Sequence, residues 1–297
     1  GRLYVYGSHD HFGGARYCGD DYVLWSADIN DLSDWVCHGR IYHRDQDPMH
    51  HINNNHLHAP DATRGPDGRY YLYYERTRPV ILNALSLIGV KWKSEIYCVE
   101  SADLKSWTEP YLVLGNTRSF EADEHGSALS NPFLIKRGDT YRLYYSCGQT
   151  FIKDCGFCEP RHITFAESKD VTKNYVARNA PIISPDKSKK HLNLCSGCLK
   201  VYELKDCYIG LQNGIFEENG KSHSAIMLLK SDDGENFEFI RLFLEPQKCG
   251  KSNWMAQYVY ACCLTYYNGK LCLYFNARNV SNNLTGRESI GIYEAEV

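Results

Sequence analysis

A turn glycine followed by an aromatic-rich strand recurs along this chain, and it restricts the folds that the chain can adopt. Residues 68–74 read GRYYLYY, and related segments are GRLYVY at 1–6, GDTYRLYY at 138–145, NGKLCLYF at 268–275 and a degenerate KDCYIGL at 205–211. Neighbouring copies lie roughly 65–70 residues apart, and a long fixed spacing of this kind is typical of repeat architectures such as propellers. Because aromatic residues suit pleated, half-buried surfaces, each copy is predicted to be a β-strand.

A second repeated element joins one strand to the next. The segment SADINDLSDW at 26–35 is echoed by SADLKSW at 101–107 and more weakly at 168–175 and 231–237. Asp, Ser and Gly favour turns at such positions. Each repeat therefore predicts an inner strand, the aromatic second strand, a third strand ending at Ser-x-Asp, and an outer strand. Four antiparallel strands of this kind make one propeller blade.

The repeats predict an all-β fold, a five-bladed β-propeller with four-stranded antiparallel blades around a central channel. We expect one domain over residues 1–297, with later blades at 58–114, 128–183, 195–244 and 258–297. The apolar stretch 79–91 is longer than a hairpin needs and predicts a short helix or an inserted hairpin. The first blade starts at its second strand and the last stops after its third. Because a closed ring avoids exposed edges, we expect a preceding segment of ~15–35 residues to complete both blades.

Composition argues against two classes of partner. The net charge is −3 with 12 His among 297 residues, which provides no basic field for nucleic acid. No apolar run approaches the roughly 20 residues that span a bilayer, and no polybasic face is evident. We therefore expect no nucleic-acid or membrane partner.

The chain has 13 cysteines, an odd number. Because disulfide frameworks are a feature of small secreted chains, reduced thiols and a cytoplasmic location are expected. Two Cys-x-x-Cys pairs, at 155–158 and 195–198, have the spacing of a four-thiolate zinc site. Ordinary thiols are favoured instead, because residues i and i+3 of a strand face opposite sides.

One edge of the predicted blades collects polar residues. In an antiparallel hairpin the start of the inner strand and the end of the second strand lie together, and the opposite ends are plain Gly and Asp turns. The polar residues at the shared edge are His9, Asp10, His58, Asp61, Glu75, Arg76, Ser130, Asn131, Gln149, Asn213, Asn276 and Arg278. The loop before the third inner strand adds Glu121, Glu124 and His125.

Paired carboxylates at such an edge are the apparatus of glycoside hydrolysis, in which one acts as acid and the other as base or nucleophile. Asp61, Glu124, Glu121 and Asp10 are the candidate catalytic residues, and the remaining residues are candidates for binding sugar hydroxyls. Structural alternatives stay open for each of them. Asp61 and Asp10 can cap turns, the acidic loop can be a solvated surface, and Glu75 with Arg76 can form a local ion pair of little energetic value.

Several motifs resemble glycoside hydrolase family 43. They are YVYGSHD at 4–10, DYVLWSA at 21–27, HAPD at 58–61 and GPDGRYYLYY at 65–74, so the resemblance is close over residues 1–115. Members of that family are five-bladed propellers that include arabinofuranosidases and xylosidases. The resemblance implies a glycosidase acting on an oligosaccharide or glycoside with inversion of configuration, without a cofactor. A calcium ion bound in the channel is left open.

The resemblance also implies three carboxylates, of which this chain matches one directly. Asp61, in the Ala59-Pro60-Asp61 motif, corresponds to the aspartate that tunes the acid. The catalytic base would lie on a strand before Gly1 and is not assigned. The position of the family's acid falls on Ser130, so either Glu124 or Glu121 supplies the proton or the acid has been lost.

Two alternatives follow from that departure. One is a catalytically inactive propeller that binds carbohydrate, for which Ser130 is the main support. The other is a glycoside phosphorylase, which needs a basic phosphate pocket that Arg76, Arg78 and Arg278 would form.

Overall fold

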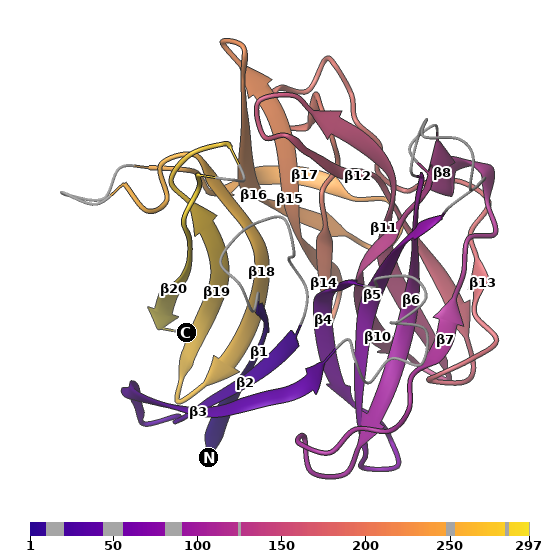
Figure 1. Cartoon of the computed structure of the whole chain (residues 1–297), viewed down its shortest axis with the longest axis vertical. Coiled ribbons are helices and arrows are strands. Elements are labelled where there is room, and N and C mark those ends of the chain that lie inside the picture. The colour runs from indigo at the N-terminus through magenta and orange to yellow at the C-terminus, as the bar shows by residue number, and fades with distance from the viewer. Residues whose placement is uncertain are drawn as a thin grey trace. The chain divides into compact units, whose positions relative to one another are not determined.

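The computed structural model describes residues 1–9, 21–43, 56–80, 91–123, 126–247, 253–282 and 285–296. In these ranges the chain is a succession of β-strands and has no α-helix (Figure 1). Two short 3-10 helices, η3 (Ser119–Glu121) and η4 (Lys190–Leu192), interrupt the strands. The predicted all-β class is confirmed.

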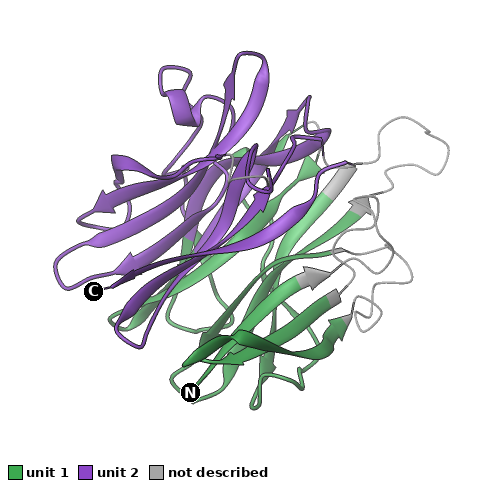
Figure 2. Cartoon of the chain, turned by 90° about the vertical axis from the view of Figure 1, so that its left-hand side faces the viewer, with its two compact units in different colours: residues 1–143, 166–177 green, residues 144–165, 178–297 purple. Residues whose placement is uncertain are grey.

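The chain divides into two compact units (Figure 2). Unit 1 comprises Gly1–Leu143 with Ala166–Ala177, and unit 2 comprises Tyr144–Phe165 with Arg178–Val297. The prediction of one domain over residues 1–297 stays a prediction.

Unit 1 contains two sheets that are antiparallel apart from one parallel pairing. The first sheet has the order β1 (Arg2–His9), β2 (Asp21–Asp28) and β3 (Asp31–His43). The second is built on β4 (His56–Arg64), β5 (Tyr70–Val80), β6 (Lys91–Ser101) and β7 (Tyr111–Leu114). The small hairpin β8 (Ala122–Asp123) and β9 (Gly126–Ser127) extends it, because β9 pairs in parallel with the start of β6.

Period-2 alternation explains how these two sheets pack. Leu72 and Tyr74 lie on one face of β5 and are fully buried against Tyr22 of β2, Tyr42 of β3 and Leu57 of β4. The rings of Tyr22 and Tyr74 meet edge to face with centroids 5.8 Å apart. The aromatic strand of the repeat is therefore a core element, and its other face, with Tyr73 and Glu75, is left to the next strands of the chain.

A four-stranded sheet follows, with the order β10 (Leu129–Arg137), β11 (Thr140–Ile152), β12 (Phe157–Ser168) and β13 (Val176–Ala177). The division between the units falls within β11 and β12. Within unit 1, β10 packs against β4, β5 and β6.

Unit 2 contains the longest continuous sheet. Its strands are β14 (Leu199–Glu203), β15 (Tyr208–Glu218), β16 (Lys221–Ser231), β17 (Glu238–Leu244), β18 (Tyr258–Tyr267), β19 (Lys270–Arg278) and β20 (Glu288–Glu296). A single parallel pair, Ser224 with Tyr258, joins β16 to β18. Leu211, Ile226, Val259 and Leu273 form the buried core of this sheet.

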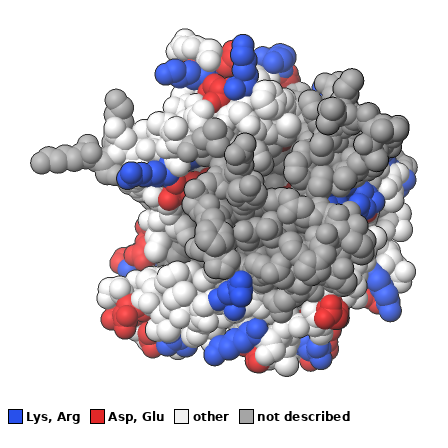
Figure 3. Space-filling model, in the orientation of Figure 1, with Lys and Arg blue, Asp and Glu red and all other residues white. Residues whose placement is uncertain are grey.

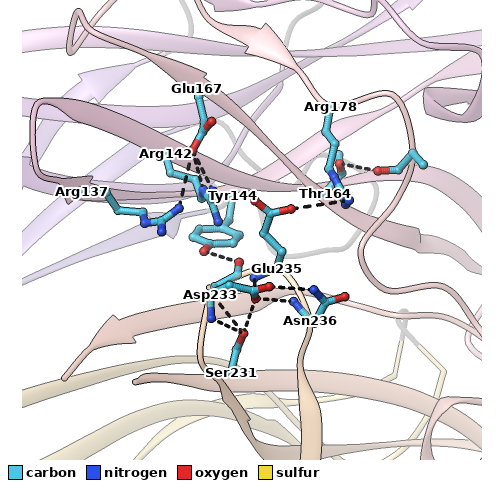
Figure 4. A network of polar contacts seen from close by, with 12 residues as sticks. Arg137, Arg142, Tyr144, Thr164, Glu167, Arg178, Ser231, Asp233, Glu235 and Asn236 are labelled. Carbon is cyan, nitrogen blue, oxygen red and sulfur yellow. Dashed lines mark hydrogen bonds and ion pairs between the residues drawn. The ribbon is translucent and has the colours of Figure 1, made fainter. Parts of the chain in front are cut away.

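Three of the four predicted Ser-x-Asp turns are confirmed, whereas β2 continues past Ser26 to Asp28. Strands β6, β12 and β16 each end at the serine of the motif. At 231–236 the Ser231 hydroxyl accepts a hydrogen bond of 2.9 Å from Gly234 N, and Asp233 Oδ1 accepts two of 2.8 Å from the next backbone N–H groups (Figure 4). These backbone donors hold the pKa of the Asp233 carboxyl well below its usual range.

The same turn recurs in the other unit at 101–106. Asp103 Oδ1 accepts hydrogen bonds of 2.8 Å from the N–H groups of Lys105 and Ser106. A local sequence motif thus produces the same backbone structure in both units.

The segment between β5 and β6 and the helices of the chain are the subject of two further predictions. Strands β5 and β6 pair out to Val80 and Lys91, and the helix or hairpin predicted between them lies at 81–90, outside the described residues. In the parts of the chain that are described, no helix has the length and hydropathy that a membrane crossing requires.

Candidate active site

The strand registers place polar residues of the inner strands opposite polar residues of the second strands, although β5 continues to Val80 and does not end at Glu75 as predicted. His58 of β4 lies opposite Glu75 of β5, and Tyr260 of β18 lies opposite Asn276 of β19. In unit 2, Leu199 near the start of the inner strand β14 lies opposite Gln212 of β15. Each hairpin therefore places its polar residues at one end and its turn at the other.

A left-handed residue marks the inner strand at this edge. Ala59 has φ +47°, and the register of β4 against β5 shifts between His58 and Asp61. Asn131, Gly197 and Ala261 have φ values of +49°, +64° and +40° at the corresponding places of the later repeats. β-Bulges are enriched next to active sites, where they redirect side chains. The bulge at Ala59 sets the position of Asp61.

Asp61 and Glu75 lie on the same face of the β4–β5 pair. Asp61 is opposite Tyr73, and Glu75 is two residues further along β5. Residues directly opposite each other share a face, and diagonal neighbours in such a ladder are about 7–8 Å apart. His58, opposite Glu75, belongs to the same face. The structure thus brings together three of the predicted site residues of unit 1.

Glu75 has the most perturbed carboxyl of this group. It is partly buried, and its Oε1 accepts a hydrogen bond of 2.8 Å from Thr77 Oγ1. Thr77 Oγ1 lies 2.8 Å from Ser94 Oγ on β6, and the Ser94 side chain is fully buried. Burial raises the pKa of Glu75 to about 7, against the opposing effect of the Thr77 and Ser94 hydroxyls. Such a carboxyl exchanges a proton near neutral pH.

Arg76 occupies the opposite face of β5. It is buried, and its guanidinium lies 4.5 Å from the ring centroid of Tyr97. The carbonyl of His58 accepts a hydrogen bond of 3.0 Å from Tyr22 Oη. Arg76 and His58 therefore both contact the aromatic core.

Ser130 and Asn131 open β10. Ser130 is buried, and Asn131 Nδ2 donates a hydrogen bond of 3.2 Å to Ser130 Oγ. A serine hydroxyl does not exchange a proton in the range that glycoside hydrolysis needs. The position to which the resemblance assigns the acid therefore has no proton donor of its own.

Glu121 has the contacts of a structural carboxylate. Its side chain is fully buried at the end of η3, and Oε2 accepts hydrogen bonds of 2.7 Å from Thr117 N and 2.8 Å from Arg118 N. These contacts fix the turn before β8. Its predicted catalytic role stays a prediction.

Three other predicted residues, Asp10, Glu124 and His125, lie outside the described residues, as does the side chain of His9. His9 itself ends β1 and pairs with Asp21. Their predicted roles therefore stay predictions.

Unit 2 carries the remaining candidates. Arg278 is buried, and its guanidinium lies 5.0 Å from the ring centroid of Tyr258 and 5.9 Å from that of Tyr260. Its Nη2 lies 3.7 Å from Cys155 Sγ. Three further polar residues lie on the strands of this unit: partly buried Asn276 and Gln149, and buried Asn213.

The sequence did not point to Thr77, Ser94 or the left-handed residues. Thr77 follows Glu75 at the period-2 spacing of a strand, which was a usable signal. Ser94 is 17 residues away and meets Thr77 only through the pairing of β5 with β6. Alanine disfavours positive φ, so nothing marks Ala59 or Ala261 in advance.

The cysteines of the described ranges are all free thiols, and Cys155, Cys195 and Cys198 are buried. Burial raises the pKa of the Cys195 thiol. Across these ranges no three His, Cys, Asp or Glu side chains gather as metal ligands would. The calcium ion considered for the channel stays a prediction.

Comparison with protein-family models gives no match. Among curated proteins, a xylosidase/arabinosidase of Thermoclostridium stercorarium is 55% identical over 74 residues. That segment is 25% of this chain and 16% of the relative. The chain therefore shares a strongly similar segment with a much longer protein.

Solved structures with the same fold cover nearly the whole chain. A GH43 β-xylosidase/α-arabinofuranosidase from a compost microbial metagenome, solved with xylotriose, has a TM-score of 0.62 and 18% identity over 99% of this chain and 87% of its own. A GH43 enzyme from Xanthomonas citri, also with xylotriose, has a TM-score of 0.64 and 16% identity over 99% and 84%.

The same fold also occurs in a protein of different activity. An N-acetylgalactosamine deacetylase from F. plautii has a TM-score of 0.67 and 12% identity over 98% of this chain and 85% of its own. These likenesses show a fold that resembles the GH43 propellers.

Proposed function

We propose that this protein is a glycoside hydrolase acting on xylose- or arabinose-type glycosides. The observation that carries the proposal is the 55% identity over 74 residues to a xylosidase/arabinosidase. Support comes from the fold, which resembles GH43 enzymes that bind xylotriose.

The finer architecture belongs to the same proposal. Three groups of four successive strands would each make one blade: β4 to β7, β10 to β13 and β14 to β17. In the same scheme β1 to β3 would lack the inner strand, and β18 to β20 would lack the outer one. This order supports five blades in a single domain over residues 1–297.

The proposed chemistry is acid–base hydrolysis with inversion. One carboxyl protonates the leaving oxygen while a carboxylate activates water on the other side of the sugar. Asp61, at the bulge of β4, would orient the donor and the bound sugar. The base is not assigned to a described residue.

Ser130 supports a second function, in which the protein binds carbohydrate without cleaving it. A site without a proton donor retains its hydroxyl-binding groups and its aromatic surfaces, so recognition survives the loss of catalysis. The phosphorylase alternative would require a phosphate pocket from Arg76, Arg78 and Arg278. The described residues visible in Figure 3 intersperse basic and acidic side chains.

The test is hydrolysis of a panel of aryl xylosides and arabinofuranosides, with and without phosphate and after chelation. Wild-type protein is expected to hydrolyse at least one of them without phosphate, and Asp61→Asn to lose activity at least about 100-fold. Asp139→Asn is the matched control, since Asp139 is an exposed turn carboxylate paired with Lys169 at 3.6 Å. Binding without hydrolysis would favour the carbohydrate-binding function, and turnover that depends on phosphate would favour the phosphorylase.

A further inference from the structure

The described carboxyls of unit 1 differ in their capacity to donate a proton to a bound sugar. Glu121 is fully buried, and one of its oxygens is occupied by two backbone N–H groups. Ser130 has no acidic group. Glu75 is partly exposed, lies in the middle of β5, and shares its face with Asp61 and His58.

The surroundings of Glu75 hold its side chain in one place. Thr77 Oγ1 donates to Oε1, and the buried hydroxyl of Ser94 supports Thr77 from the neighbouring strand. Both partners lie on the same face as Glu75, because Thr77 follows it by two residues and Ser94 pairs with Thr77. A proton donor needs this kind of fixed position to act on a bound glycosidic oxygen.

We infer that Glu75 is the proton donor of the proposed glycosidase, replacing the acid that is missing at Ser130. The inference rests on the proposed function. The Glu75 carboxyl transfers its proton to the glycosidic oxygen while the bond from that oxygen to the anomeric carbon breaks. The leaving group departs as an alcohol, water adds its oxygen to the anomeric carbon, and the proton released by the water replaces, through solvent, the one that Glu75 gave up.

The acidity of Glu75 agrees with this role. General acid catalysis is most efficient when the pKa of the donor lies near the working pH. The desolvated carboxyl has a pKa of about 7, so a substantial fraction is protonated at neutral pH. An exposed glutamate, with a pKa near 4.3, would be ionised almost completely.

The decisive measurement compares two leaving groups on the same sugar. A dinitrophenyl group departs without protonation, whereas an alkyl or sugar alcohol needs a proton. For Glu75→Gln we expect kcat/KM to fall by about 100-fold or more on the disaccharide or methyl glycoside. On the dinitrophenyl glycoside it is expected to fall less than about 10-fold, because that step does not use the acid.

Controls separate this role from a structural one. Glu100→Gln changes a carboxylate on β6 that pairs with Arg69 at 3.1 Å, and it is expected to leave both rates unchanged. Glu75→Asp keeps a carboxylic acid and serves as the test if Glu75→Gln fails to fold. It is expected to retain more activity than Glu75→Gln on the disaccharide or methyl glycoside.

Each remaining outcome overturns the inference. Equal losses on both substrates, or no loss on either, would show that Glu75 does not donate the proton although the enzyme is a glycosidase. No hydrolysis of any glycoside by wild-type protein would overturn the proposed function, and this inference with it.

Discussion

Thr77, which lies two residues further along the same face of β5, donates a hydrogen bond of 2.8 Å from its Oγ1 to Glu75 Oε1. The same oxygen of Thr77 lies 2.8 Å from Ser94 Oγ on β6. Hydrogen bonds to a carboxylate favour its ionised form, whereas burial disfavours it. Because burial wins at Glu75, the two hydroxyls moderate a pKa that would otherwise be higher still.

Thr77→Val is therefore expected to raise the pKa of Glu75 above about 7. Valine keeps the shape of the side chain but removes the donor. Carbon NMR titration of the glutamate carboxyls, with Glu75→Gln to assign the signal, measures the shift. Thr164→Val is the control, because that buried hydroxyl donates to Ala180 O in unit 2. An unchanged or lower pKa in Thr77→Val would contradict the assigned cause.

The raised pKa of Glu75 predicts how stability depends on pH. A carboxyl whose pKa is higher in the folded state favours folding below the pKa of the unfolded chain, and that contribution is lost as pH rises through the folded value. Between pH 4 and pH 8 the free energy of unfolding of the wild type is expected to fall by up to about 3 kcal/mol more than that of Glu75→Gln. Urea unfolding of both proteins across this range measures the difference. Parallel curves would show that Glu75 ionises normally.

Glu121→Gln tests the structural role of the other buried glutamate. The amide oxygen is a weaker acceptor than the carboxylate for the N–H groups of Thr117 and Arg118, so the free energy of unfolding is expected to fall by about 2 kcal/mol. Hydrolysis per folded molecule is expected to stay unchanged. Thermal unfolding checks the first statement, and kcat on an aryl glycoside, corrected for the folded fraction, checks the second. Lost hydrolysis with unchanged stability would instead support Glu121 as the acid.

Gly197→Ala tests the close approach at the start of the fourth repeat. Gly197 has φ +64°, and a Cβ there would meet Asn213 O at 1.8 Å. The substitution is expected to cost roughly 3 kcal/mol or more, because a backbone carbonyl must move. Gly220 has φ +75° with nothing within 4 Å, so Gly220→Ala is expected to cost only about 1–2 kcal/mol. Equal losses of unfolding free energy in the two variants, measured by urea unfolding, would show that the Asn213 carbonyl does not restrict the side chain at position 197.

The parts of the fold that could be predicted are those with local causes. The Ser101 and Ser231 turns were visible as sequence motifs because a short side chain satisfies the next backbone N–H groups within a few residues. The pairing of His58 with Glu75 followed from hairpin topology. The sequence left the acid open between Glu124, Glu121 and a lost acid, because a carboxylate in the sequence carries no mark of how deeply it is buried.

What the sequence by itself determined was the order of the strands and the edge at which polar residues gather, since both depend on period-2 alternation and turn chemistry. Only the tertiary structure decided that the pKa of the Glu75 carboxyl is raised. Burial raises the pKa of Glu75, and the backbone N–H groups of Thr117 and Arg118 hold the Glu121 carboxylate at η3. Desolvation is a property of the packed surroundings, which residues distant in sequence supply.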